Sequence, residues 1–289
     1  MPRARANGVE LEYDTFGDPA DPPLLLVMGL GAQLIDWPPE FAAQLAAHGF
    51  HVIRFDNRDA GLSTWLDEVG MPDLPALLTG TGTAPYSLAD MGDDAVGLLD
   101  ALGIQRAHIV GASMGGMIVQ RMVLDHPDRV LSMTSIMSTT GARDVGQPSE
   151  SATAMLLRPQ APDRESAIEA MVAGYRLTSS TGFVVTDEEL RDRAVSYYDR
   201  AYHPAGGARQ LAAIIATPDR TEALAGVTVP TSVIHGDIDR LVNVSGGRAT
   251  AAAIPGAELL IIPGMGHDLP TGAWPQLVDT IVRTAKRAG

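Results

Sequence analysis

Short apolar runs alternate along this chain with segments of helical periodicity, and this alternation restricts the fold more than any other feature. Runs without polar alternation are typical of strands whose two faces are both covered by helices. They are PLLLVMG (23–29), HVIRFD (51–56), RAHIVGA (106–112), VLSMTSIM (130–137), TSVIHG (231–236) and AELLIIPG (257–264). We therefore expect a mostly parallel, doubly wound α/β sheet, with VELEYDTFG (9–17) as an antiparallel edge strand.

Helical segments separate these runs. Pro38–His48 ends before Gly49, and Ser87–Leu102 ends before Gly103. The second begins with Ser87-x-x-Asp90, a helix-cap signature in which a short acid replaces the usual Glu. A last helix that carries Trp274, Leu277, Val278, Ile281 and Val282 at helical spacing is expected to cover the sheet.

The alternation stops between about Gly141 and Ala223, where helical patterns occur without a convincing strand. The patterns are DRESAIEAMVAGY (163–175), TDEELRDRAVSYYDRAY (186–202) and ARQLAAIIA (208–216). We expect an α/β core formed by residues 1–140 and 224–289, with residues 141–223 inserted as a helical cap, or lid, at one edge of the sheet.

Composition excludes several classes of function. The net charge of −14 argues against nucleic acid and against an anionic membrane surface as partners, since a basic patch is missing. The chain has no cysteine, and Lys286 is its only lysine, which argues against thiolate, cysteine–zinc and Schiff-base chemistry. The first residues, MPRARANGVELEYDTFG, contain no apolar signal core, and the longest apolar stretch, PLLLVMGLGA, is about half as long as a membrane span requires, so we expect a cytoplasmic protein.

One motif carries a candidate nucleophile. Gly111-Ala112-Ser113-Met114-Gly115 follows an expected strand and precedes an expected helix. In a G-x-S-x-G turn of this kind, the small residues let strand and helix approach closely, and the serine hydroxyl is raised above the carboxyl edge of the sheet. The alternative is a glycine-rich turn without chemistry.

A serine nucleophile needs a base, and His267 in IIPGMGHDLP is the best candidate. It follows the last expected strand, in a glycine-rich loop at the same edge of the sheet as Ser113. We expect packing, capping or surface roles for most of the other histidines, which are His48, His51, His108, His126 and His203.

The acid that orients the base is expected in VIHGDIDRLV, where Asp237 and Asp239 follow another strand. We favour Asp239, because Asp237 directly follows Gly236 and suits an Asx turn. The resulting chain order is serine, acid, histidine, as in sheets of this type. A weaker alternative makes metal ligands of the acids together with His235 and His267, although it leaves Ser113 unexplained.

Two backbone N–H groups are candidates for an oxyanion hole. Met114 follows the nucleophile at the start of a helix, so its N–H points toward an oxyanion formed beside Ser113. Leu30, between Gly29 and Gly31 after the first central strand, is the second candidate donor. A tight glycine turn without a catalytic role explains the same three residues equally well.

Taken together, these motifs resemble the α/β-hydrolase superfamily over nearly the whole chain. VMGLG stands at the oxyanion loop, FDNRDAGLS (55–63) matches the Asp-x-Arg-Gly-x-Gly-x-Ser loop, and GASMGG, HGDIDRLV and GMGHDLP carry the three catalytic candidates. GDPADPPLLLVMGLG with HVIRFDNRDAGLST is similar to the aclacinomycin methylesterases and related carboxylesterases. Two residues depart from the common pattern: Met28 replaces a His, and Asp59 replaces a Gly.

This resemblance implies a serine carboxylesterase-type hydrolase that acts through an acyl-enzyme on a small or medium apolar ester, with a methyl ester among the candidates. It implies no metal and no organic cofactor. The same triad also serves cofactor-free haloperoxidases or perhydrolases, lactonases, C–C hydrolases and hydroxynitrile-cleaving enzymes. A ligand-binding receptor that retains the fold is a further alternative. The expected partner is a small-molecule ester, and a homo-oligomer is left open.

Overall fold

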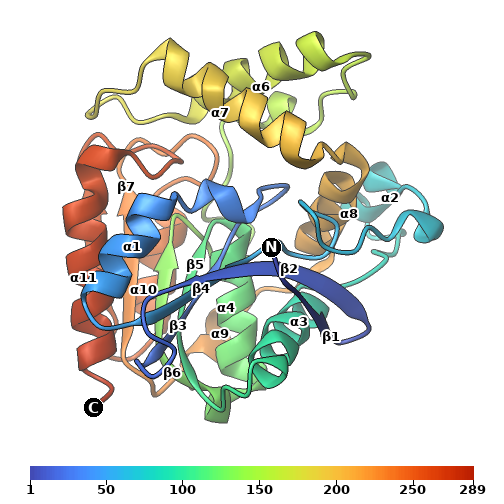
Figure 1. Ribbon diagram of the computed structural model, residues 1–289. Coiled ribbons are helices and arrows are strands. Elements are labelled where there is room, and N and C mark those ends of the chain that lie inside the picture. The colour runs from blue at the N-terminus through green and yellow to red at the C-terminus, as the bar shows by residue number, and fades with distance from the viewer.

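Eight strands form one sheet in the computed structural model, which describes residues 1–289 (Figure 1). Their order across the sheet is β1-β2-β4-β3-β5-β6-β7-β8. The pairs β1–β2 and β2–β4 are antiparallel and all other pairs are parallel, which confirms the expected fold class. The strands are β1 (Arg3–Ala6), β2 (Val9–Phe16), β3 (Pro23–Val27), β4 (His51–Phe55), β5 (Ala107–Ala112), β6 (Val130–Ile136), β7 (Thr231–Gly236) and β8 (Glu258–Ile262).

The helices of the sheet-bearing part of the chain are α1 (Pro39–Ala47), α2 (Leu74–Leu78), α3 (Leu88–Ala101), α4 (Met114–Asp125), α10 (Ser245–Ala253) and α11 (Trp274–Lys286). Short 3₁₀ helices lie at Leu34–Asp36, Asp67–Val69, Pro127–Arg129 and Thr271–Ala273. The predicted capping box of α3 is present, because the Ser87 hydroxyl accepts the N–H of Asp90 and the Asp90 carboxylate accepts the N–H of Ser87. None of the helices is both long and apolar enough to cross a membrane.

Both faces of the sheet are buried, as the apolar runs predicted. Along β3, Leu24 and Leu26 pack in one apolar cluster with residues of α1 and α11, whereas Leu25 and Val27 pack in a second cluster with residues of α3 and α4. Successive strand residues point to opposite faces, so one strand supplies both layers. Each fully buried leucine contributes about 1.5–3 kcal/mol to folding. This rigid three-layer core supports the loops at the strand ends.

The edge hairpin is more complete than expected. Besides the predicted strand β2, the structure contains β1, and the two are joined by Asn7-Gly8 with φ values of 45° and 84°. Asn-Gly with positive φ at both residues is typical of a two-residue hairpin turn, which is the signal that could have predicted β1.

Between β6 and β7 the chain forms only helices: α5 (Glu150–Leu156), α6 (Arg164–Thr178), α7 (Asp187–Ala201), α8 (Pro204–Ala216) and α9 (Thr221–Leu224). We call residues 141–223 the insertion. Three of its helices were expected, whereas α5, the first turn of α8 and the short α9 were not. In Figure 1, α6 and α7 lie across one end of the molecule, beyond the sheet, and α8 lies beside α2.

Candidate active site

Ser113 occupies the turn between β5 and α4 in a strained conformation. Its φ of 58° and ψ of −121° lie in a region that costs a residue with a side chain about 1–3 kcal/mol. The turn is also too crowded for larger neighbours: a Cβ on Gly111 would lie 2.1 Å from the Gly115 carbonyl oxygen, and one on Gly115 would lie 2.0 Å from the Val27 oxygen. The glycines of the motif are therefore required by the close approach of strand and helix.

The structure brings Ser113, His267 and Asp239 together in a hydrogen-bonded chain. His267 Nδ1 lies 2.7 Å from Asp239 Oδ2, and His267 Nε2 lies 2.8 Å from Ser113 Oγ. An ionised carboxylate only accepts hydrogen bonds, so Nδ1 carries the proton and Nε2 is free to accept the serine hydroxyl. The arrangement can deprotonate Ser113 as its oxygen attacks an electrophile.

Asp239 is held by donors on both carboxylate oxygens. Its Oδ1 accepts the N–H groups of Leu241 at 2.8 Å and Val242 at 2.9 Å, and its Oδ2 also lies 3.3 Å from Nε2 of His235. Burial opposes ionisation, but the electrostatic interaction with His267 and the hydrogen bonds from both imidazoles outweigh it and hold the pKa of Asp239 well below its usual range. The side chain is fully buried, and it stays ionised at neutral pH.

Asp237, the other candidate acid, lies away from His267. Its side chain is exposed, and Oδ1 accepts the N–H of Gly264 at 2.7 Å, in the turn that follows β8. The Asx turn that we expected at Asp237 lies instead at Asp239, whose carboxylate accepts the N–H two residues further on. Of the two acids, only Asp239 contacts His267.

The four residues of the metal alternative do not form a ligand group. His235 Nε2 lies 2.8 Å from the Val242 carbonyl oxygen, an acceptor, so this nitrogen carries a proton and is not free to bind a metal. Nowhere does the structure gather three His, Asp or Glu side chains that could hold a metal ion. The donor set therefore favours proton transfer and not metal ligation.

The loop after β3 runs directly beside Ser113. A Cβ on Gly29 would lie 2.9 Å from Ser113 Cβ and 3.4 Å from its Oγ, so only glycine fits here. Leu30 follows in the turn closed by the Ala32 N–H to the Gly29 carbonyl, and its own N–H has no acceptor within the protein. Met114 is the first residue of α4, so its N–H has no partner within the helix.

The loop 55–63 packs against the loop after β3, which carries the candidate oxyanion donor Leu30. Asp56 is fully buried, and its carboxylate accepts the N–H of Leu34 at 2.6 Å and of Leu62 at 2.9 Å while it pairs with Arg200 of α7 at 2.7 Å. Burial raises the pKa of Asp56 against the opposing effect of Arg200. Through the N–H of Leu34, the loop 55–63 thus holds the segment that follows Leu30.

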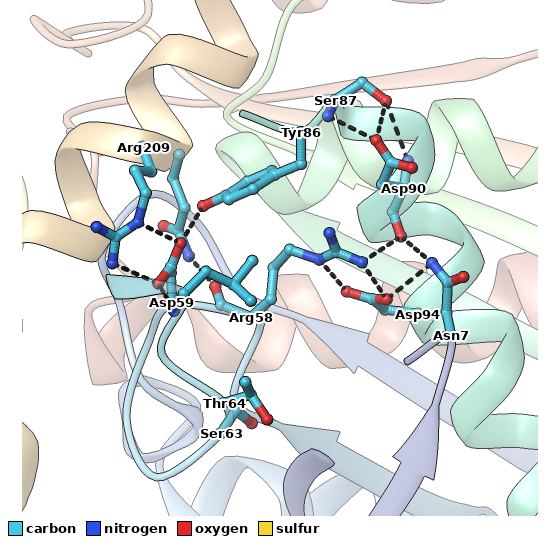
Figure 2. A network of polar contacts seen from close by, with 12 residues as sticks. Asn7, Arg58, Asp59, Ser63, Thr64, Tyr86, Ser87, Asp90, Asp94 and Arg209 are labelled. Carbon is cyan, nitrogen blue, oxygen red and sulfur yellow. Dashed lines mark hydrogen bonds and ion pairs between the residues drawn. The ribbon is translucent and has the colours of Figure 1, made fainter. Parts of the chain in front are cut away.

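Asp59, for which the sequence offered no role, lies in a buried polar network (Figure 2). Its φ is 64°, a conformation that aspartate tolerates better than most residues. Arg209 of α8 binds both carboxylate oxygens, at 2.7 and 2.8 Å, and the hydroxyl of Tyr86 donates at 2.9 Å. Burial opposes ionisation of Asp59, but the hydrogen bond from Arg209 and the other donors lower its pKa. Arg58 points away to Asp94, as Figure 2 shows.

The insertion also holds the loop that carries His267. The N–H of His267 donates to the Thr178 carbonyl at 2.7 Å, and the neighbouring Asp268 accepts the N–H and the hydroxyl of Ser180. The Ser180 hydroxyl oxygen in turn accepts the N–H of Gly266 at 2.9 Å. Sequence reasoning missed these residues, because no local pattern marks a contact between segments almost ninety positions apart.

Known proteins resemble this chain in sequence and in fold. The family model described as "alpha/beta hydrolase fold" matches residues 22–270. The rhodomycin D methylesterase DauP of Streptomyces sp. strain C5 is 32% identical over 97% of this chain and 96% of its own length, and DnrP of Streptomyces peucetius, also a rhodomycin D methylesterase, is 31% identical over the same shares.

A solved structure agrees on the fold. The enol-lactonase from Burkholderia xenovorans LB400 has a TM-score of 0.75 and 24% identity, with 99% of this chain and all of that chain covered. The matches to the two methylesterases extend over nearly the whole chain, and a further relative, of Pseudomonas sp, that covers 72% of it is named a hydrolase. The chain is therefore a hydrolase that belongs to the alpha/beta hydrolase fold family.

Proposed function

We propose that this protein is a serine carboxylic-ester hydrolase with Ser113 as nucleophile, His267 as general base and acid, and Asp239 as the residue that orients His267. The continuous hydrogen-bonded chain from Asp239 through His267 to Ser113 carries this proposal. A serine hydroxyl is a weak nucleophile at neutral pH, and a base within hydrogen-bond distance removes that barrier.

In the first half of the reaction, Ser113 Oγ attacks the ester carbonyl while its proton passes to His267 Nε2. The tetrahedral oxyanion accepts hydrogen bonds from the N–H groups of Leu30, in the loop beside Ser113, and of Met114, the residue after Ser113, both of which lack protein acceptors. Removal of one such donor costs an enzyme about 10²- to 10³-fold in kcat. Collapse of the intermediate transfers the proton to the leaving alcohol and leaves an acyl-enzyme.

Water then completes the cycle. His267 accepts a proton from a water molecule as the water attacks the acyl carbonyl, and it returns that proton to Ser113 Oγ when the acid product leaves. Every proton transfer in this scheme passes through His267, which lies within hydrogen-bond distance of Ser113, so the scheme requires no metal or organic cofactor.

For the substrate, we propose a methyl ester of a bulky, mostly apolar acid. The support is the similarity to two rhodomycin D methylesterases along nearly the whole chain. We further propose that residues 1–140 and 224–289 act as the catalytic core, and that the insertion, residues 141–223, forms the cap over Ser113 and most of the substrate pocket. Its helices α6 and α7 lie beyond the sheet edge (Figure 1).

The test is a substrate panel measured as the difference in turnover between wild-type protein and Ser113→Ala. The panel contains p-nitrophenyl esters of increasing chain length, methyl esters of polycyclic polyketides, a γ-lactone, and an ester with added peroxide. We expect the highest kcat/KM on a bulky methyl ester. Turnover confined to the lactone or to the peroxide arm would overturn the esterase assignment and favour a lactonase or a perhydrolase.

A further inference from the structure

Two consecutive residues of α8, Arg209 and Gln210, are almost completely buried although they belong to the insertion. Gln210 uses both ends of its amide: Oε1 accepts the N–H of Gly31 at 2.7 Å, and Nε2 donates to the Arg58 carbonyl at 2.7 Å. One side chain thus joins the loop after β3 to the loop after β4. A buried glutamine without these partners would be costly, so the contacts define where α8 sits.

The hydrogen bond at Gly31 lies next to the proposed oxyanion donor. The turn from Gly29 to Ala32 leaves the Gly31 N–H without an internal acceptor, and Gln210 supplies one. The Gly31 carbonyl accepts the hydroxyl of Tyr197 from α7. The insertion therefore holds the two peptide groups that flank Gly31, whose φ is 64°. Because these groups follow directly on Leu30, the same contacts constrain the orientation of the Leu30 peptide.

Arg209 explains why Gln210 reaches this position. Gly206, Arg209 and Gln210 stand at i, i+3 and i+4 of α8, on one face of the helix. A Cβ on Gly206 would lie 2.0 Å from the Asp59 carbonyl oxygen, so the helix backbone rests directly on Asp59. The two-pronged pair of Arg209 with the Asp59 carboxylate, seen in Figure 2, then fixes the rotation of the helix.

We propose that Gln210 is a positioning residue for the oxyanion hole: the insertion, anchored at Asp59 by Arg209, sets the geometry of the Gly29–Gly31 turn through Gln210. This inference rests on the proposed function, because it assigns the turn to transition-state binding. It predicts a loss in kcat and in oxyanion affinity, with little change in the binding of substrate in its ground state.

The experiment uses Gln210→Leu in the full chain, with active sites counted by fluorophosphonate titration. We expect kcat per titrated site to fall by about 10- to 100-fold, since a displaced oxyanion donor loses most of its benefit, while KM changes by less than about threefold. A trifluoromethyl ketone forms a tetrahedral oxyanion when Ser113 Oγ adds to its carbonyl and the serine proton passes to His267. Its inhibition constant should rise by the same factor as kcat falls.

The matched control is Gln120→Leu. Gln120 is equally buried, in α4, and its side chain accepts a hydrogen bond from Arg220 and does not contact the loop after β3. We expect both kcat per site and the inhibition constant to stay near wild-type values in this variant. A loss of titratable sites in Gln210→Leu with unchanged kcat per site and inhibition constant would show a purely structural role and overturn the proposal.

If Gln210→Leu does not fold, a second pair of variants with smaller structural changes tests the same proposal. Tyr197→Phe removes only the hydroxyl that holds the Gly31 carbonyl, and Tyr198→Phe removes the hydroxyl of the neighbouring ring that stacks on Tyr202. We expect a three- to tenfold fall in kcat per site for the first alone, with a parallel rise in the inhibition constant. Equal values for the two would contradict the proposal. Wild-type protein that does not react with fluorophosphonate would overturn the proposed function itself, and this inference with it.

Discussion

The sheet and the insertion are held together by different forces. Two large apolar clusters fill the faces of the sheet, whereas the insertion has one small cluster made of Ile168, Val172, Leu190 and Ala194. The outer face of the insertion carries exposed ion pairs such as Arg164–Asp199 and Arg176–Asp187. Exposed pairs contribute about 0–1 kcal/mol each, so we infer that the insertion depends on its contacts with the core for its stability.

Apolar residues of the insertion such as Ala213 and Phe183 pack in or against the core clusters, but several of its contacts are polar and end on the loops that carry the candidate catalytic groups. The buried or half-buried links are Arg209 to Asp59, Arg200 to Asp56, Gln210 to Gly31 and Ser180 to Asp268. The apolar core thus supports the strands, while the polar contacts with the insertion set the loops at their ends. We therefore infer that the insertion helps to position the candidate catalytic loops in addition to covering them.

Among the variants that compare the two regions, the largest effect is expected within the core, at the acid. Asp239→Asn reverses the polarity of the hydrogen bond to His267 Nδ1 and favours the wrong tautomer, which should lower kcat by roughly 10³- to 10⁴-fold with a modest change in KM. Asp237→Asn should have little effect, because an asparagine oxygen still accepts the Gly264 N–H. Steady-state kinetics on variants of matched melting temperature would decide. A greater loss of kcat in Asp237→Asn would show that the other carboxylate orients the base.

The second prediction concerns the contact between the two regions. Asp59→Asn keeps a residue that tolerates φ of 64° but leaves Arg209 with only the exposed Asp67 as a charged acid, at 2.9 Å. Because a buried charge loses its main partner, we expect the free energy of unfolding to fall by about 3 kcal/mol.

Its control lies on the outer face of the insertion. Arg191→Ala removes ion pairs to Glu165 and Glu169 that are exposed on both sides, and should cost less than about 1 kcal/mol. Urea unfolding of both variants measures the difference. Similar losses for Asp59→Asn and Arg191→Ala would refute the distinction between buried contacts and surface pairs.

The smallest effect is a pH dependence that arises in the core alone. Burial lowers the pKa of His108, in β5, from 6.5 to about 4, and its Nδ1 lies 2.8 Å from Ser132 Oγ. Between these pH values the unfolded chain binds a proton that the folded protein excludes, so stability is lost as the pH falls from about 6.5 to about 4. The loss due to this group should be about 2–3 kcal/mol.

The measurement is the difference in unfolding free energy between wild-type protein and His108→Gln at a series of pH values. The wild type should lose more stability than the variant across this range, whereas His48→Gln, at an exposed helix end, should follow the wild type. Parallel curves for wild type and His108→Gln would contradict the assignment.

The sequence predicted most of the sheet and the arrangement of the candidate site for one physical reason. Ser113, Asp239 and His267 each follow the carboxyl end of a parallel strand, and these ends share one edge, so order along the chain could be converted into proximity. No such rule predicts contacts such as the one between Asp59 and Arg209. They join positions 150 residues apart and depend on how α8 packs, which periodicity does not encode.

The central claim is that Ser113 is the only nucleophile of this hydrolase, and covalent labelling tests it most directly. Wild-type protein treated with diisopropyl fluorophosphate should gain one phosphoryl adduct, mapped to Ser113 by peptide mass analysis, and should lose ester turnover in proportion to the labelled fraction. Ser113→Ala should gain no adduct and should turn over esters at least roughly 10⁴-fold more slowly. Ester turnover that persists after complete labelling, or an adduct on another residue, would contradict the account.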